Sequence, residues 1–265
     1  MRIALCQFVS DTDPEANLAT IGEQTAEAAR RGARVVVFPE AAMARFGIPL
    51  GPVAQPLDGP WASAVRDFAK QHDVLVVAGM FTPSEDGRVR NTLLVTGAGV
   101  DEHYDKIHLF DAFGFAESAT VAPGDRSLTL SVDGVGVGVA TCYDLRFPQL
   151  FQRLANSGAS VIVVPASWGS GPGKREQWEL LVRARALDST SWLAACGQAD
   201  PSTVGVTTKP GVPTGIGYSA VVSPLGEIRA QAVDRPELLV VDIDPSEVDD
   251  ARAKVPVLAN ARDFS

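Results

Sequence analysis

The sequence predicts an α/β fold whose sheets are mixed, with parallel and antiparallel strands side by side. Short apolar runs typical of strands alternate with longer amphipathic segments typical of helices along the 265 residues. Several neighbouring strands are joined by tight turns, such as the one around Asp86-Gly87, which favour antiparallel pairing. We find no internal repeat, low-complexity segment or linker, so we expect one domain that spans residues 1–265.

The N-terminal half alternates strands with two helices. The first helix is expected over residues 14–31, because a proline starts it and Leu18 and Ile21 share one face. The second helix is expected over residues 61–71, after a loop rich in proline and glycine. The strands of this half are expected at residues 2–9, 35–38, 74–81, 91–96 and 100–106.

The C-terminal half continues the alternation. A helix with one apolar face is expected over residues 148–157, and a longer helix follows over residues 175–188. A short helix is expected from Pro245, and the tail from Val255 is expected to be irregular. The strands of this half are expected at residues 127–132, 135–142, 160–165, 192–196, 218–223, 227–232 and 238–243.

The net charge of the chain indicates which classes of binding partner are unexpected. The chain has 23 basic and 32 acidic residues and a net charge of −9, which argues against nucleic-acid and anionic-membrane binding. The N-terminal stretch MRIALCQF lacks the apolar core of a signal peptide, and no apolar run is long enough to cross a bilayer. We therefore expect a cytoplasmic protein that binds a small molecule.

Three widely spaced cysteines, Cys6, Cys142 and Cys196, are an odd number and form no C-x-x-C pair. With only three histidines in addition, a disulfide scaffold and a structural zinc site are both unexpected, and we expect no metal. Cys6 and Cys196 lie inside apolar strand patterns, so we interpret both as core residues.

Cys142 differs, because it ends a charge-free strand pattern and precedes the polar segment YDLR. A cysteine at a strand-to-helix junction can have a lowered thiol pKa, since helix N-termini and cations favour the thiolate. Free cysteines are also among the most often buried residues. The position alone leaves a reactive thiol and a packed core thiol equally open.

Three charged residues occupy positions where chemistry could use them. Glu40 directly follows the apolar run VVVFP, Lys106 ends the alternating run HYDK, and Glu117 lies in the loop FGFAES. A carboxylate at the end of a buried strand is either paired or functional, because an isolated buried charge is costly. An exposed lysine and a loop glutamate are ordinary, so each residue alone is a weak signal.

Together, these residues resemble the Glu-Lys-Cys triad of the nitrilase superfamily, the carbon–nitrogen hydrolases. The similarity lies in the strings VVVFPEAA, YDKIHLFD and GVATCYDLRFP, which occur in the order and spacing of that family. It continues in FAES with APGD, QWELLVRARALD, GYSAVVSPLGEI and DIDPSEVDDAR with KVPVL, and so covers nearly the whole chain. Among the branches, the chain is most similar to the Nit-type amidases, which include ω-amidases and deaminated-glutathione amidases.

The resemblance implies a reaction and a set of roles. Cys142 would attack a small linear amide and form a thioester, releasing ammonia and then a carboxylate. Glu40 would act as general base and acid, and Lys106 with the backbone N–H of Tyr143 would stabilise the oxyanion. Glu117 matches a second glutamate that positions the substrate and the leaving group. No cofactor is implied.

The resemblance also implies a four-layer α-β-β-α sandwich and a homodimer or a higher even homo-oligomer. Asp144 and Arg146 fit the family motif, and we interpret them as an ion-paired support for the loop. Arg146 could in addition bind a substrate carboxylate. Trp168 could shape the pocket, which the glycine-rich segment 169–174 would line.

Two departures from the family pattern bear on the acyl group. Gln177 stands where Nit-type amidases commonly have a histidine, and Tyr218 stands where many have the histidine of Gly-His-Ser. These departures leave the core chemistry intact and the acyl preference open. The same triad could also serve a nitrilase or an N-carbamoyl amide hydrolase.

Two other kinds of protein are alternatives to a hydrolase with a Glu-Lys-Cys triad. A Cys-His hydrolase would need an imidazole partner for Cys142, and His108 lies on the same strand side as Lys106. No local signature of such enzymes is present, so we expect His108 to be a hydrogen-bonded structural group. A nitrilase-fold scaffold or binding protein with vestigial activity is the alternative outside the enzymes, and the intact triad argues against it.

Overall fold

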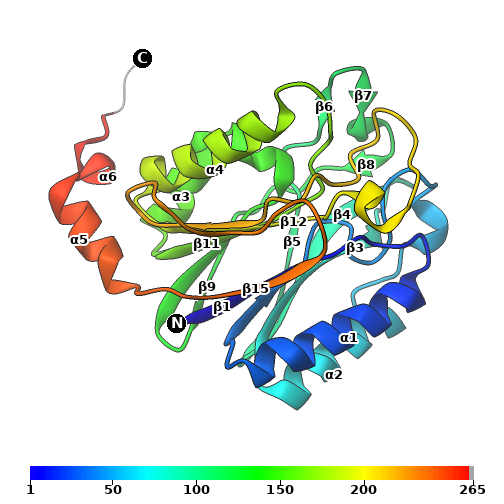
Figure 1. Cartoon of the computed structure of the whole chain (residues 1–265), viewed down its shortest axis with the longest axis horizontal. Helices are drawn as coiled ribbons and strands as arrows, with labels where there is room; N and C mark the ends of the chain where they lie inside the picture. Colours follow the sequence, from blue (N-terminus) through cyan, green and yellow to red (C-terminus); the bar gives the residue numbers. More distant parts are fainter. Residues whose placement is uncertain (263–265) are drawn as a thin grey trace.

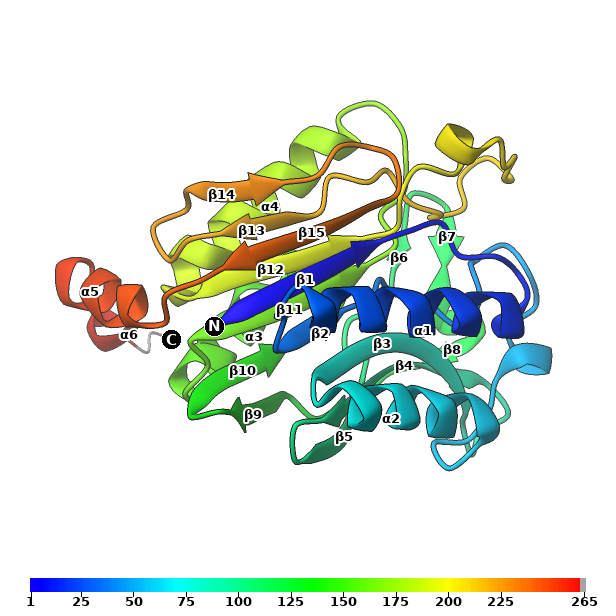
Figure 2. The ribbon, with the colours of Figure 1, turned by 60° about the horizontal axis from the view of Figure 1, so that its bottom comes forward.

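The computed structural model describes residues 1–262, and its centre is a pair of β-sheets packed face to face. Helices cover the outer faces of both sheets, so that the layers run helix, sheet, sheet, helix (Figures 1 and 2). This is the expected four-layer α-β-β-α sandwich, and the predicted fold class is confirmed. The single domain and the even-numbered oligomer stay predictions.

The first sheet is built mostly from the N-terminal half of the chain. Its strands, in spatial order, are β15 (Glu237–Asp242), β1 (Arg2–Gln7), β2 (Val35–Val37), β3 (Leu75–Pro83), β4 (Val89–Gly97) and β5 (Val100–Asp105), with β8 (Val121–Ala122) beside β4. The three strands β1, β2 and β3 run parallel, and β15, β4 and β5 pair antiparallel with their neighbours. The helices α1 (Pro14–Arg30) and α2 (Pro60–His72) cover its outer face.

The second sheet comes from the C-terminal half. Its strands, in spatial order, are β14 (Ile228–Gln231), β13 (Ala220–Val222), β12 (Trp192–Gly197), β11 (Val161–Ala166), β10 (Val135–Val139) and β9 (Leu128–Val132). Here β10, β11 and β12 form the parallel centre. The helices α3 (Pro148–Asn156) and α4 (Lys174–Ser189) cover the outer face. Both sheets are therefore mixed, as the tight turns in the sequence predict.

Short elements complete the chain. The strands β6 (Asp111–Ala112) and β7 (Phe115–Ala116) form a separate hairpin, and the chain ends in α5 (Ser246–Lys254) and α6 (Val257–Asn260). Four 3₁₀ turns lie in the loops: η1 (Gly51–Val53), η2 (Glu117–Ala119), η3 (Cys142–Arg146) and η4 (Pro201–Val204). Within residues 1–262, the helices are all too short or too polar to cross a membrane.

Alternate residues of the strands build the core between the sheets. Leu5, Val37 and Val77 of the first sheet belong to the same buried cluster as Val139 and Val163 of the second. The intervening residues of each strand pack against the helices in separate clusters. Because the central strands are buried on both faces, their sequences are continuous apolar runs, as expected for parallel strands.

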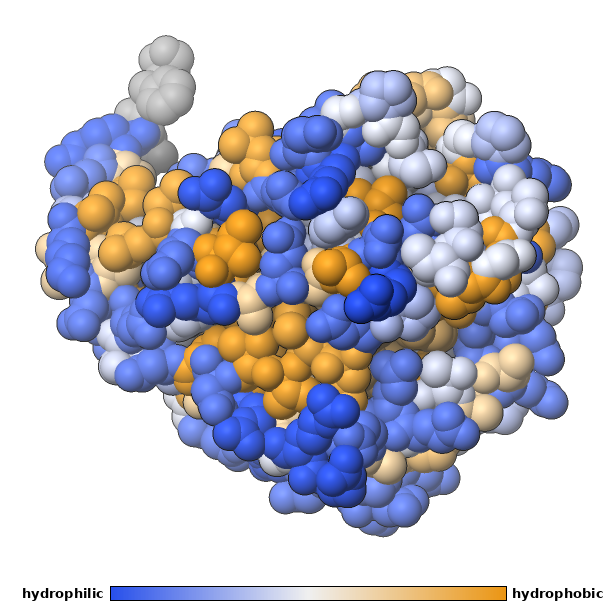
Figure 3. All heavy atoms as spheres, in the orientation of Figure 1, coloured by the Kyte–Doolittle hydropathy of each residue, from blue (hydrophilic) through white to orange (hydrophobic). Residues whose placement is uncertain are grey.

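The strand β15 lies at one edge of the first sheet and is less covered than the strands beside it. Its apolar residues 238–241 are half-buried, and Figure 3 shows apolar side chains gathered over this strand. It pairs antiparallel with β1 in a register that places Arg2 opposite Asp242. The first and last strands of the chain are thus hydrogen-bonded neighbours.

Many boundaries differ from the sequence-based prediction by one or two residues, and three differences have a clear physical reason. The strand expected to reach Cys142 ends at Val139, since residues 142–146 turn as η3. The strand expected from Tyr218 begins at Ala220, because Tyr218 is in the left-handed backbone region with φ 56°. The tail from Val255 was expected to be irregular, but Val257–Asn260 form α6, a single turn too short for periodicity to reveal. The end of that tail, residues 263–265, lies outside the described residues.

Candidate active site

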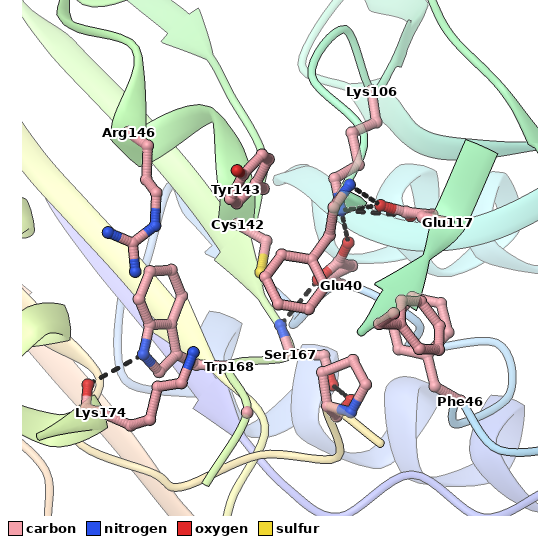
Figure 4. Close-up of a pocket in the computed structure, with 14 residues that line it drawn as sticks. Glu40, Phe46, Lys106, Glu117, Cys142, Tyr143, Arg146, Ser167, Trp168 and Lys174 are labelled. Atoms are coloured by element: carbon pink, nitrogen blue, oxygen red, sulfur yellow. Dashed lines mark hydrogen bonds and ion pairs between the residues drawn. The ribbon is translucent and has the colours of Figure 1, made fainter. Parts of the chain in front are cut away.

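The candidate site lies where strands of both sheets end. Glu40 follows β2 and Lys106 follows β5 in the first sheet, whereas Cys142 follows β10 and Ser167 follows β11 in the second. Parallel strands end at the same edge of a sheet, so the loops that leave β2, β10 and β11 converge. The result is a cavity of about 430 Å³, measured out to its opening, into which these side chains point (Figure 4).

All seven residues predicted for the site line this one cavity: Glu40, Lys106, Glu117, Cys142, Tyr143, Arg146 and Trp168. They come from five separate stretches of chain and both sheets. Cys142 and Glu40 face one another across the cavity, with Lys106 and Glu117 beside Glu40 (Figure 4). The structure therefore brings together every residue that the sequence suggested.

The backbone at Cys142 is unusual. Its φ is 42°, in the left-handed region that a residue with a Cβ rarely adopts. Two hydrogen bonds hold this turn, because the Asp144 carboxylate accepts the Thr141 N–H at 2.8 Å and the Thr141 backbone carbonyl accepts the Asp144 N–H at 2.9 Å. The turn ends β10 and directs the thiol into the cavity (Figure 4).

The Glu40 carboxylate is fixed at both oxygens although it is only 1% exposed. Oε1 accepts from Lys106 Nζ at 2.9 Å and from Asn91 Nδ2 at 2.7 Å, and Oε2 accepts from the Ser167 N–H at 2.9 Å. The backbone beside it is tightly packed, because a Cβ at Gly79 would lie 2.6 Å from the backbone nitrogen of Ala41. Glu40 is thus a buried, rigidly held carboxylate.

Lys106 bridges two carboxylates. Its Nζ lies 2.9 Å from Glu40 Oε1 and 2.9 Å from Glu117 Oε2, and that second oxygen also accepts the Phe110 N–H at 2.6 Å. Burial alone would lower the pKa of Lys106, but the charges of Glu117 and then Glu40 outweigh it and hold that pKa well above its usual range. Lys106 therefore stays a cation inside the cavity.

The thiol of Cys142 does not follow the expectation of a lowered pKa. Burial raises its pKa well above the usual range, and the Glu40 carboxylate raises it further, while Lys106 opposes them only in part. The expectation counted the cation and the turn but not the burial or the adjacent carboxylate. A thiol with so raised a pKa is protonated at neutral pH, so a nucleophilic role requires a base to remove its proton.

The predicted ion pair between Asp144 and Arg146 is wrong. The buried Asp144 carboxylate instead accepts from Tyr104 Oη at 2.7 Å and from the Thr141 N–H at 2.8 Å, and it lies 2.7 Å from His108 Nδ1. The tight turn at Cys142 explains the difference, since it points Asp144 back under the loop. His108 is thus the hydrogen-bonded structural group that the sequence suggested.

Arg146 points into the cavity instead of supporting the loop. Its guanidinium lies 5.5 Å from the Trp168 ring centroid and donates to Gln177 Oε1 at 2.6 Å. Gln177, one of the two departures from the family pattern, therefore orients a cationic side chain of the site. Tyr218, the other departure, packs under the Arg175 guanidinium at 3.9 Å and does not line the cavity.

A second cation, Lys174, lies at the mouth of the cavity. Its Nζ is 3.6 Å from the ring centroid of Phe113 and 5.7 Å from that of Phe110, and burial, followed by the charge of Arg146, lowers its pKa. The backbone carbonyl of Lys174 accepts the indole N–H of Trp168 at 2.9 Å. The expectation that segment 169–174 lines the pocket is confirmed for its two ends.

Sequence reasoning missed several residues of the site. Ser167 contacts Glu40 through its backbone, which no side-chain pattern reveals. Asn91, which lies on β4, contacts both glutamates. The sequence did carry one signal for this residue, because asparagine is uncommon inside a strand. The apolar walls that were missed are Phe46, Phe110, Phe115 and Pro213. Across residues 1–262, no group of three or more His, Cys, Asp or Glu side chains is placed to hold a metal ion.

Comparison with known proteins agrees with this site. The sequence pattern of the carbon–nitrogen hydrolase family matches residues 2–253. A Mycobacterium tuberculosis protein described as a hydrolase is 57% identical over 270 residues, covering 100% of this chain and 96% of its own. The deaminated glutathione amidase of Escherichia coli O157:H7 is 34% identical over 267 residues, covering 99% of this chain and 97% of its own.

A solved structure shows the same fold. Nit3 of Saccharomyces cerevisiae, described as a member of branch 10 of the nitrilase superfamily, superposes with a TM-score of 0.84 at 25% identity, covering 97% of this chain and 94% of that one. The chain therefore belongs to the carbon–nitrogen hydrolase family, and the predicted resemblance to the nitrilase superfamily is confirmed. It is a hydrolase with amidase-type relatives.

Proposed function

We propose that the protein is a thiol amidase that hydrolyses a small linear amide to a carboxylate and ammonia through a thioester on Cys142. One observation carries the proposal: a neutral thiol, a buried carboxylate and a buried ammonium converge in a single cavity. Each supplies what the others lack, since the thiol needs a base and the reaction develops negative charge on an oxygen.

In the first half of the reaction, Cys142 Sγ bonds to the amide carbonyl carbon while its proton passes to Glu40. The carbonyl oxygen becomes an oxyanion, which the Lys106 ammonium and the Tyr143 N–H stabilise. The tetrahedral intermediate then collapses: the C–N bond breaks, the C=O bond reforms, and Glu40 returns the proton to the nitrogen. Ammonia leaves, and the acyl group remains on the sulfur.

In the second half, a water molecule bonds to the thioester carbon and gives one proton to Glu40. A second oxyanion forms at the same place and is stabilised by the same donors. The C–S bond breaks, the carboxylic acid departs, and the proton on Glu40 returns to the sulfur. Glu117 contributes by holding Lys106, whose Nζ lies 2.9 Å from Glu117 Oε2.

The cavity favours an acyl group that carries its own carboxylate. Glu40 and Glu117 are occupied by Lys106, whereas Arg146 and Lys174 in the outer part of the cavity have no carboxylate partner among the described residues. An anionic group placed there would complete a charge-assisted pair between aromatic walls. The relative named deaminated glutathione amidase agrees with a substrate of this kind.

The test is intact-mass spectrometry of the protein mixed with short amides, alongside measurement of the released ammonia. We expect a transient acyl adduct and ammonia with the wild type and with Cys6→Ala, which removes a buried cysteine outside the cavity. Cys142→Ala should give neither. The series should include butyramide and succinamate, which differ by a carboxylate, and the acidic amide should react faster.

The same series separates the alternatives. If no amide gives an adduct or ammonia, the proposed amidase is wrong, and nitriles and N-carbamoyl compounds are the next substrates to test. If neither of these acylates Cys142, the chain is a scaffold or binding protein built on an enzyme fold. An adduct that persists in Cys142→Ala would overturn the thioester at this residue.

A further inference from the structure

Asn91 touches Glu40, Glu117 and Lys106 without lining the cavity. It lies on β4, where it is 1% exposed, and its Nδ2 donates to Glu40 Oε1 at 2.7 Å and to Glu117 Oε1 at 3.1 Å. Its backbone carbonyl accepts the Lys106 N–H at 2.9 Å. One residue thus contacts both carboxylates through its side chain and the ammonium-bearing residue through its backbone.

The inner cluster of the site, formed by Glu40, Glu117 and Lys106, carries a net negative charge. Glu40 and Glu117 bring two negative charges, Lys106 brings one positive charge, and Cys142 is neutral at rest. Two like charges in a buried site favour uptake of a proton by one of them. An N–H donated to a carboxylate favours the ionised form, and the Asn91 amide reaches both carboxylates.

The orientation of the Asn91 amide indicates that the side chain serves to bind the two carboxylates and does more than fill space in the core. Its Oδ1 is buried and has no hydrogen-bond partner in the described residues, which is a cost that a residue kept for stability alone would not carry. Rotating the amide to satisfy the oxygen would turn that oxygen toward two carboxylates. The amide is therefore held with its nitrogen on Glu40 and Glu117.

We propose that Asn91 is a positioning residue that keeps Glu40 and Glu117 ionised together, so that Glu40 can accept the Cys142 proton at neutral pH. This inference rests on the proposed function in one respect, the role of Glu40 as base. The titratable groups beside Glu40 are Lys106 from the loop after β5, Glu117 from η2 and Cys142 from η3, and the same cavity holds the cations Arg146 and Lys174. Asn91 acts through these groups and touches no reacting atom.

The test compares Asn91→Leu, which keeps the size but removes both donors, with Asn91→Asp, which puts an acceptor in their place. The control is Asn17→Leu, because Asn17 is also buried and its Nδ2 also donates twice, to the backbone carbonyls of Asp11 and Met43. Two rates are measured from pH 4 to 10: alkylation of Cys142 by iodoacetamide, located by peptide mass spectrometry, and kcat/KM for an amide.

In the wild type, both rates should fall on the acid side as the base takes up a proton. In Asn91→Leu, this acid-side midpoint should move to higher pH by about one unit, the size of one hydrogen bond to a charged group. Asn91→Asp should move it further, since a third carboxylate joins the site. Asn17→Leu should lower the melting temperature and leave the midpoint in place.

Two results would overturn the inference. One is an Asn91→Leu variant that slows both rates by the same factor at every pH, as a purely structural residue would. The other is an unshifted midpoint in both Asn91 variants. The alkylation rate requires no substrate, so a shifted midpoint in a protein that hydrolyses no amide would support the role of Asn91 and refute the amidase.

Discussion

Lys106 Nζ lies 2.9 Å from Glu40 Oε1, and the two side chains are 2% and 1% exposed. Solvent contact is too small to stabilise either charge by itself, so each depends on the other. Breaking a buried pair by removing one partner is strongly destabilising, because it leaves an uncompensated charge in a low-dielectric interior. The ion pair of Lys106 and Glu40, to which we assign catalytic roles, is thus also needed for the stability of the folded site.

Lys106→Met should therefore reduce both stability and activity. It removes the only cation that contacts the two carboxylates in the described structure, and we expect a loss of about 3–5 kcal/mol in the free energy of unfolding. Urea denaturation measures this loss, and the hydrolysis rate should fall below detection. Lys70→Met, on the exposed face of α2, is the control and should change neither quantity. A fully stable Lys106→Met variant would contradict the strength assigned to the pair.

Glu40→Gln should separate catalysis from folding. The amide keeps the shape of the carboxylate but has no base, so we expect kcat to fall about 10²- to 10⁴-fold, the usual contribution of a general base. A rate within a few-fold of the wild type would show that another group removes the proton.

The pH dependence of stability has a definite sign. Burial raises the pKa of Cys142, Cys6 and Cys196 in the folded state, so each thiol binds its proton more tightly there than in the unfolded chain. The stability from these groups is complete below the unfolded pKa of about 8.5 and is lost progressively above it. Denaturation at pH 7 and pH 10 should show this loss, and it should be smaller in Cys142→Ala. An equal loss in both proteins would exclude Cys142 from the effect.

Arg146→Gln and Lys174→Gln should change acyl preference. For an acidic amide such as succinamate, each change removes a cation from the outer cavity, and we expect KM to rise about tenfold with little change in kcat. For butyramide, which has no carboxylate, KM should be nearly unchanged. Arg153→Gln, on the exposed face of α3, is the control. Equal effects on both amides would remove the argument for an acidic acyl group.

The left-handed backbone at Cys142 makes a prediction about stability alone. Within a helix or strand, glycine normally lowers the stability of a protein by about 0.5–1 kcal/mol relative to alanine. At a φ of 42°, however, glycine is unstrained, whereas alanine is strained. Cys142→Gly should therefore be at least as stable as Cys142→Ala, in reverse of the usual order. Thermal denaturation of the two inactive variants decides the point, and a clearly less stable glycine variant would show that the turn is not strained.

Much of the fold could be predicted because its signals are local. Continuous apolar runs identify the central strands, and one apolar face identifies each helix. The errors fall where the sequence carries no periodic signal. The end of the strand before Cys142 depends on the hydrogen bonds between Thr141 and Asp144, and α6 is too short to show a period. These features leave no repeating pattern in the sequence.

The residues of the site were predicted more completely than their environment. The strings around Glu40, Lys106 and Cys142 identify side chains, but they do not give the burial that raises the pKa of Cys142. They also do not show that Asp144 turns toward Tyr104 and His108, away from Arg146. Contacts made by backbone groups, such as the Ser167 N–H on Glu40, were invisible for the same reason.

The pairing of β1 with β15 has a consequence for how the protein is made. The first sheet has one side of β1 unpaired until the ribosome has released residues 237–242, which follow β1 by more than 200 residues. The thiol on the second sheet and its base on the first can meet only when both sheets have docked. Until both sheets have formed and docked, the nascent chain lacks the proposed nucleophile–base pair, and we expect no reaction at Cys142 that depends on Glu40.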